Sequence, residues 1–198
     1  MHPETANIPE IVDVGYATYI MIRGYGPWDD RQGAYAKACS VLRKIRTELE
    51  KSAPDFDPAL KRSPLETFWW QREKTTLDLD NKETLVWVVA IQVGNISPRS
   101  FQTAKESVSS HQSIDCSNAF LGTISERRCV QIRHTGGYEN EKETVAIMMA
   151  FASEEGYEAN PCCFSPHHEI YLPSKEKGKR GQWDTIFRRS IRKQTSGR

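Results

Sequence analysis

ETFWWQ, residues 66–71, places two tryptophans side by side in a segment that predicts a β-strand. Because adjacent side chains of a strand point to opposite faces of the sheet, Trp69 and Trp70 cannot both enter the same core. The alternation puts Glu66, Phe68 and Trp70 on one face and Trp69 on the other. We therefore predict that Trp69 packs under helices and that Trp70 helps to line a groove for an aromatic ligand.

The residues around this strand predict a strand–helix–strand–strand unit. Residues 16–23 (YATYIMIR) are rich in aromatic and β-branched residues and predict a first strand. Apolar residues between positions 30 and 51 recur at three- and four-residue spacing, which predicts a helix with one buried stripe. Residues 52–64 contain three prolines, so they cannot continue that helix and predict a loop. Residues 84–92 predict another strand, joined to residues 66–71 through the charged segment that ends in DLDNKE.

The second half of the chain repeats this order. Residues 129–134 (CVQIRH) predict a strand, and the glycines that follow supply a tight turn. Residues 139–155 carry one apolar face and end at Gly156, a suitable residue for a helix C-terminus. Strands are then predicted at residues 167–172 (HHEIYL) and 184–191 (DTIFRRSI).

These patterns predict an α+β fold with two pseudo-symmetric βαββ repeats. The repeats cover about residues 12–95 and 126–192, and they form antiparallel sheets with helices on one face and a central ligand groove. Ser97 followed by proline is a favourable helix start, so residues 97–111 are predicted to be a linker helix. A chain of 198 residues can bury one sizeable core, and we expect residues 1–198 to form a single domain.

Superposing the two halves aligns Glu66 with Glu169, and each glutamate has an aromatic residue two positions later. The matching face would carry Glu169 and Tyr171, while Ile170 and Leu172 would lie under helices. An apolar groove with two carboxylates has the usual composition of a small-molecule pocket. A carboxylate there can act as a general base for water or as the counter-ion of a cationic ligand. Solvated glutamates at strand edges are the alternative.

Composition excludes several classes of protein. The net charge of +1 supplies no field for nucleic acid, so direct nucleic-acid binding is not expected. The longest apolar run, Val86–Ile91, is far shorter than the roughly 20 residues that cross a membrane. The polar N-terminus does not resemble a secretory signal, and a cytoplasmic location is expected. We expect a monomer or weak dimer. A typical effector-responsive regulator is not expected, because no helix-turn-helix segment precedes the repeats.

No motif predicts a metal or a cofactor. His167 and His168 are adjacent and would face opposite ways on a strand, so we expect no metal ligands, and phosphate-cradling and dinucleotide fingerprints are missing. Cysteines are odd in number and form no CxxC pair, which favours reduced thiols. They are Cys39, Cys116, Cys129, Cys162 and Cys163.

Several segments together resemble the GyrI-like small-molecule-binding domains. In the second half these are VQIRHTGGYENE, EEGYE, HHEIYL and DTIFRRSI. In the first half, LETFWWQ and LVWVVAIQ are similar to a subset of the family with a double-tryptophan strand. The resemblance covers most of residues 12–192. It implies two βαββ repeats around a central groove, with Glu169 meeting cationic aromatic ligands.

The double-tryptophan subset is similar to hydrolases that open the cyclopropane of spirocyclopropyl DNA-alkylating compounds of the yatakemycin class. The resemblance implies a drug-resistance or detoxification role. Our hypothesis for the mechanism is that Glu169, with Glu66 as a second candidate, activates water and that the Tyr138 hydroxyl stabilises charge on the conjugated carbonyl oxygen. The resemblance also implies an aromatic cage around the substrate. The cage residues are Phe68, Trp70, Tyr138 and Tyr171, with Trp69 and Trp87 as further members.

Two other functions stay open. A non-catalytic multidrug-binding module would sequester cationic or aromatic small molecules or modulate a partner protein. Haem binding by a related two-repeat fold would need an axial ligand, for which His134 is the candidate. Trp87, on the apolar strand LVWVVAI, is equally compatible with simple core packing.

Overall fold

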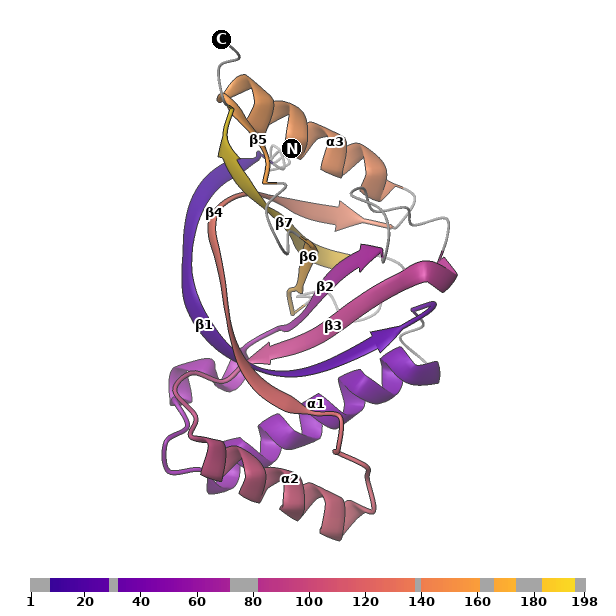
Figure 1. The fold of residues 1–198 in the computed structure, drawn as a ribbon, viewed down its shortest axis with the longest axis vertical. Helices are drawn as coiled ribbons and strands as arrows, with labels where there is room; N and C mark the ends of the chain where they lie inside the picture. Colours follow the sequence, from indigo (N-terminus) through magenta and orange to yellow (C-terminus); the bar gives the residue numbers. More distant parts are fainter. Residues whose placement is uncertain are drawn as a thin grey trace, which may run out of the picture. The chain divides into compact units, whose positions relative to one another are not determined.

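The computed structural model describes residues 8–28, 32–71, 82–137, 140–160, 166–173 and 183–194. The chain divides into two compact units. The first unit is Tyr16–Ser125, and the second unit is Met1–Gly15 with Glu126–Arg198. Both units combine antiparallel strands with helical cover, so the predicted α+β fold is confirmed (Figure 1). The first unit follows the order strand, helix, strand, strand, and the second unit has one further short strand directly after its helix.

The sheet of the first unit is built around β3 (Leu85–Gln92). This strand pairs in antiparallel fashion with β1 (Glu10–Tyr25) on one side and with β2 (Leu65–Gln71) on the other. Trp69 lies directly opposite Trp87 in the β2–β3 register. Nearly every residue of β3 is buried, which explains its continuous apolar sequence.

Helix α1 (Gly33–Ser52) covers one face of this sheet. Its apolar residues recur at helical spacing and form the buried stripe that the sequence predicts. The helix ends where the N–H of Ala53 bonds to the carbonyl of Leu49 and a proline follows. The buried residues are Tyr35, Ala38, Cys39, Leu42, Ile45 and Leu49.

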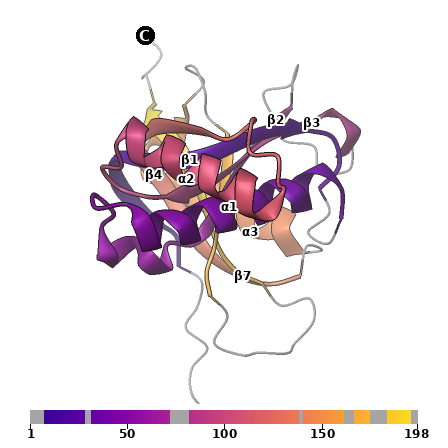
Figure 2. The ribbon, with the colours of Figure 1, turned by 90° about the horizontal axis from the view of Figure 1, so that it is seen from below.

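Helix α2 (Pro98–Gln112) packs against α1, and both helices lie side by side in Figures 1 and 2. The helix begins as its sequence predicts, since Ser97 Oγ accepts a hydrogen bond from the Ser100 N–H at 3.1 Å. Phe101, Ala104 and Val108 extend the core under α1.

The two faces of β2 divide the tryptophans as the parity of the strand requires. Trp69 is 3% exposed and stacks on Tyr35 of α1, with ring centroids 5.3 Å apart. Phe68 and Trp70 lie on the opposite face, where they form a separate cluster with Tyr19 of β1. Trp69 is therefore the core tryptophan, as predicted, while the part of Trp70 in a ligand groove stays a prediction.

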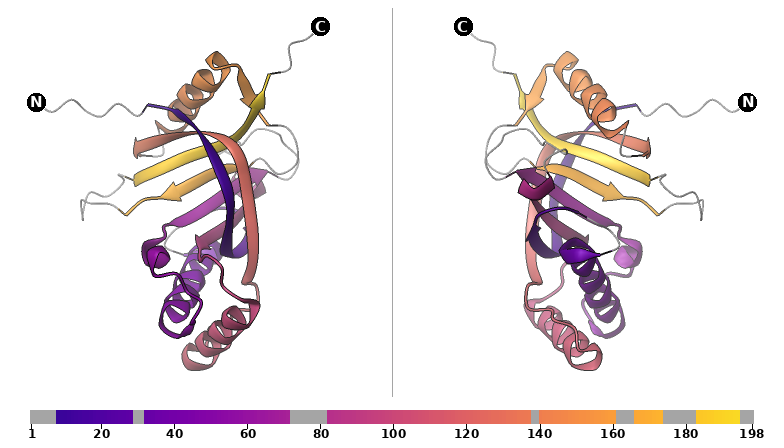
Figure 3. Two further views of the ribbon diagram at one scale, coloured as in Figure 1. Left: turned by 90° about the vertical axis from the view of Figure 1, so that its left-hand side faces the viewer. Right: turned by 90° about the vertical axis from the view of Figure 1, so that its right-hand side faces the viewer.

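The sheet of the second unit is built around β7 (Trp183–Lys193). This strand pairs in antiparallel fashion with β4 (Phe120–Gly136), with β6 (His167–Tyr171) and with β5 (Tyr157–Ala159). Helix α3 (Glu141–Glu154) lies beside β5 and β7 in Figure 3. Its residues Met148 and Ala152 pack on Ile132 and Phe187. Gly156 follows the helix with a φ of 77°, as its predicted role at the C-terminus requires.

Three strands differ from the sequence-based prediction. Strands β1 and β4 begin at Glu10 and Phe120, earlier than the predicted residues 16 and 129, because their first halves are only partly buried and lack a clear apolar pattern. The short strand β5 was not predicted.

Three cysteines, Cys39, Cys116 and Cys129, are free and buried, while Cys162 and Cys163 lie outside the described residues. Among the described helices, none has the length and apolar character needed to cross a membrane.

Candidate functional site

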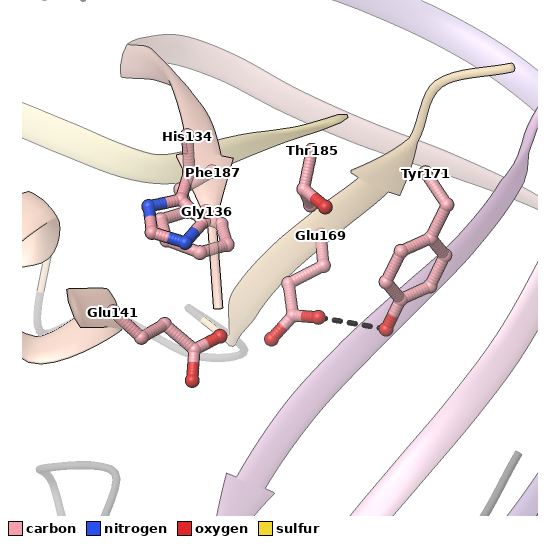
Figure 4. Close-up of a pocket in the computed structure, with 7 residues that line it drawn as sticks. All are labelled: His134, Gly136, Glu141, Glu169, Tyr171, Thr185 and Phe187. Atoms are coloured by element: carbon pink, nitrogen blue, oxygen red, sulfur yellow. Dashed lines mark hydrogen bonds between the residues drawn. The ribbon is translucent and has the colours of Figure 1, made fainter. Parts of the chain in front are cut away.

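A small pocket, partly open to solvent, lies in the second unit (Figure 4). Strands β4, β6 and β7 and the start of α3 supply its walls. The space that the pocket encloses is about 10 Å³, roughly the room that one water molecule needs, so it is far smaller than the pockets that hold drug-sized ligands. Its lining residues are His134, Gly136, Glu141, Glu169, Tyr171, Thr185 and Phe187.

The register of β6 places Glu169 on the face of the sheet that α3 covers. Glu169 lies opposite Phe187 of β7, and Phe187 packs with Met148 of α3. Ile170, which is 7% exposed, therefore points to the other face. The prediction that Ile170 lies under a helix is wrong. Strand β6 is short and buried on both faces, so its composition does not indicate which face meets the helix.

The two aligned glutamates thus differ in their local setting. Glu66 pairs across the strands with Ala90, which belongs to the cluster on the face opposite α1. Glu169 lies on the helix-covered face of its own unit. Both carboxylates are 4% exposed, so the alternative of solvated strand-edge glutamates does not describe either of them.

The carboxylate of Glu169 lies close to two other residues of β6. The Tyr171 hydroxyl donates a hydrogen bond to Oε2 at 2.7 Å, drawn as the dashed line in Figure 4. His167 Nε2 lies 3.4 Å from Oε1. Hydrogen bonds to a carboxylate are short and strong, so Tyr171 fixes the direction in which this group faces the pocket.

Glu141 is a second buried carboxylate of the pocket, and the sequence-based prediction missed it. It is the first residue of α3 and is 5% exposed. Figure 4 shows its carboxylate on the same side of the pocket as that of Glu169. The positive end of the helix dipole favours a carboxylate at this position. An acidic first turn is the sequence signal that could have drawn attention to it.

His134 is engaged on both ring nitrogens. Nδ1 lies 2.8 Å from Thr144 Oγ1, and Nε2 lies 3.3 Å from the Gly137 carbonyl oxygen. The ring also stacks on Phe187, with centroids 4.8 Å apart. These contacts leave neither nitrogen free to ligate a haem iron, which argues against the haem alternative.

The aromatic candidates of the first unit fall into two groups. Phe68 and Trp70 lie with Glu66 on the face opposite α1, where the Arg23 guanidinium lies 5.4 Å from the Trp70 ring centroid and 5.5 Å from that of Tyr25. Trp69 and Trp87 lie in the core under α1. Tyr138, the predicted hydroxyl donor, lies outside the described residues.

Known structures share this fold. An uncharacterised conserved protein from Listeria innocua superposes with a TM-score of 0.81 at 27% identity, covering 94% of this chain and 93% of that chain. A hydrolase from Listeria innocua gives 0.77 at 26% identity, covering 95% and 94%. The EcmrR C-terminal domain gives 0.60 at 14% identity, covering 96% and 99%, and shows the fold alone.

No curated protein matches the sequence. The family model described as the GyrI-like small molecule binding domain matches residues 9–186, which is nearly the whole chain. The chain therefore belongs to the GyrI-like small-molecule-binding domain family.

Proposed function

We propose that this protein binds flat aromatic compounds and hydrolyses the cyclopropane of spirocyclopropyl DNA-alkylating molecules. The observation that carries the proposal is the buried carboxylate of Glu169, oriented by Tyr171 at the wall of a pocket. Membership of a small-molecule-binding family supports the ligand class. The similarity to a hydrolase from Listeria innocua supports chemistry at such a site.

In the proposed reaction Glu169 acts as the general base. It takes a proton from a water molecule while the water oxygen forms a bond to a cyclopropane methylene carbon. The strained carbon–carbon bond breaks, and its electron pair moves into the conjugated ring, so that the carbonyl oxygen becomes a phenolate. The proton then neutralises that oxygen, and the net change is the addition of one water molecule.

Positioning contributes most of the rate in this scheme. Ring strain already favours opening, so a held near-attack geometry is the main requirement. Phe68, Trp70 and Tyr171 are the proposed stacking residues, and Glu66 and Tyr138 are further polar candidates. Trp69 and Trp87 would act by supporting the strand, since they are 3% and 1% exposed under α1.

The experiment is incubation of the full chain with a spirocyclopropyl alkylator in H₂¹⁸O, followed by mass spectrometry. The expected product carries one added water with the heavy oxygen at the former methylene carbon. Glu169→Gln keeps the shape of the side chain and should abolish turnover. Glu158→Gln is the matched control, because Glu158 is 41% exposed and pairs with Arg192 on the surface of the same unit. An unchanged alkylator with the wild-type protein would contradict hydrolysis.

Sequestration without chemistry is the second candidate function. The pocket-lining residues of the described chain include two carboxylates and no lysine or arginine, which favours a cationic aromatic ligand. Binding of several unrelated aromatic cations, measured by calorimetry with every compound recovered intact, would support this function.

A further inference from the structure

We propose that Glu141, His167 and Glu169 form a binding site for a divalent transition-metal ion, with Zn²⁺ as the best match. One ligand atom from each side chain lies within 4.8 Å of the others. The three residues are 5%, 4% and 4% exposed, respectively. The site shares Glu169 with the proposed function but stands on separate observations, and it does not depend on the hydrolysis reaction.

The state of His167 is the first argument. Its Nε2 is buried and makes no hydrogen bond in the described part of the chain. The atom lies 3.4 Å from Glu169 Oε1, although the arrangement is not that of a hydrogen bond. Buried polar atoms are normally satisfied, so an imidazole nitrogen aimed at a carboxylate without bonding to it points to a missing partner between them.

The distance itself fits two ligands of one ion. Zinc binds imidazole nitrogen and carboxylate oxygen at roughly 2.0–2.2 Å in tetrahedral sites, which separates neighbouring ligand atoms by roughly 3.3–3.5 Å. The 3.4 Å between His167 Nε2 and Glu169 Oε1 matches this separation. An oxygen of Glu141, at the start of α3, lies within 4.8 Å of both atoms, and rotation of its flexible side chain would bring it to the same ion.

The negative charges of Glu141 and Glu169 also favour a bound cation. Two carboxylates buried close together repel each other and lose hydration, and a divalent ion between them would cancel both effects. The Tyr171 hydroxyl binds Oε2 of Glu169 and leaves Oε1 directed at His167. A hydrogen bond to a ligating carboxylate is the usual outer-shell support of a metal site.

The donor set selects the ion. Mg²⁺ and Ca²⁺ prefer oxygen ligands and would gain little from the imidazole of His167. One imidazole with two carboxylates suits Zn²⁺ and its spectroscopic substitute Co²⁺. Three protein ligands are also the number found in sites that keep one position for water. Glu141 and Glu169 line the pocket, which gives an ion a path to the site.

The test uses the tag-free full chain after treatment with a chelator. Zn²⁺ binding is measured by equilibrium dialysis with elemental analysis, and Co²⁺ binding by its visible absorption. We expect one ion per chain and a Co²⁺ spectrum with the intensity of a tetrahedral site. Glu141→Gln, His167→Gln and Glu169→Gln should each weaken binding about 10-fold or more, and Tyr171→Phe by roughly 10–100-fold.

Glu143→Gln is the matched control, because Glu143 is an exposed glutamate in the same first turn of α3. It should bind the metal as the wild type does. Thermal unfolding with and without Zn²⁺ checks the folding of every variant, and at one fixed Zn²⁺ concentration the rise in Tm is expected to be larger for the wild type and Glu143→Gln than for the ligand variants. Absence of saturable binding to the wild type, or equal binding by all three ligand variants, would overturn the proposal.

The two proposals can fail separately. Hydrolysis by the metal-free protein would leave Glu169 as the base and would show that an ion is not needed for the reaction. Stoichiometric Zn²⁺ binding with an intact alkylator would support the metal site and contradict the hydrolysis.

Discussion

The Tyr171 hydroxyl and the Glu169 carboxylate lie two residues apart on β6 and are joined by a 2.7 Å hydrogen bond. A hydrogen bond to a charged group contributes about 1.5–3 kcal/mol. We expect Tyr171→Phe to lower kcat for alkylator hydrolysis about 10-fold with a smaller change in KM, because the carboxylate loses its orientation while most of the ring surface stays. Steady-state kinetics measure this split.

Tyr157→Phe is the control for that variant. Tyr157 is in the same unit, and its hydroxyl bonds to Arg128 away from the pocket-lining residues. Its removal should leave kcat unchanged. Equal rates for Tyr171→Phe and the wild type would contradict an orienting role for the hydroxyl.

The adjacent tryptophans of β2 should respond differently to truncation. Trp69 is buried among α1 side chains, so Trp69→Ala should cost about 3–5 kcal/mol of unfolding free energy. Trp70 is only partly buried on the opposite face, and Trp70→Ala should cost less while weakening aromatic ligands. Urea denaturation and ligand titration measure the two effects. Similar losses of stability for both variants would contradict the assignment of faces.

Glu126 should make the stability of the folded protein fall at acid pH. Burial alone would raise the pKa of Glu126, but the hydrogen bond from His168 at 2.9 Å and the charges of His168 and Arg188 outweigh it and hold the pKa below its ordinary value of 4.5. A lowered pKa in the folded state stabilises the protein above pH 4.5, and this contribution is lost as the pH falls through the folded-state value.

We therefore expect Glu126→Gln to destabilise the protein by about 3 kcal/mol at neutral pH, as for other broken buried pairs. The difference from the wild type should shrink as the pH is lowered below 4.5. Urea denaturation across this pH range measures it. Glu158→Gln, which breaks an exposed pair with Arg192, should cost at most about 1 kcal/mol. A stability difference between Glu126→Gln and the wild type that does not change with pH would contradict a lowered pKa of Glu126 in the folded protein.

Cys129 should be inert towards thiol reagents in the folded protein. Burial raises the pKa of its thiol to about 12, so the reactive thiolate is scarce at pH 8. The same shift means that its contribution to stability is present below the ordinary pKa of 9.0 and is lost as the pH rises towards 12. Labelling with a disulfide reagent, followed by peptide mass mapping, should find Cys129 modified only in denaturant. Rapid labelling of the native protein would contradict its burial.

Gly24 should not tolerate a larger residue. A Cβ at this position would overlap the indole ring of Trp87. We expect Gly24→Ala to cost about 1–3 kcal/mol, the usual range for overpacking a core. Trp87→Phe in the same chain should recover part of this loss, because the smaller ring leaves room. Additive losses in the double variant would show that the two residues do not compete for space.

Strong local periodicity made much of the fold predictable. The stripe of α1 and the alternation of β2 follow from geometry that every helix and strand obeys, so the burial of Leu42 and the separation of Trp69 from Trp70 could be derived from spacing. The N-cap of α2 and the glycine after α3, Gly156, were predictable for a second reason. The backbone groups at helix ends lack partners within the helix, and only certain residues satisfy them.

The site depended on information that spacing does not carry. Strand β6 is buried on both faces, so the side on which Glu169 lies depends on which face α3 covers. Glu141 becomes a pocket residue only because the chain turns α3 back onto the sheet. His167 shares a face with Glu169, which parity gives, but its lack of a hydrogen bond required coordinates.

The guanidinium of Arg23 rests above the indole of Trp70. A planar cation that belongs to the protein therefore already covers this ring, and a flat guest that stacks there would have to displace it. A neutral ligand would break the attraction between the Arg23 guanidinium and the Trp70 ring without replacing it, whereas a positively charged ligand would form a similar attraction itself. Selection among ligands at Trp70 would then depend on whether the ligand carries a positive charge that can replace that of Arg23, more than on the size of the ligand.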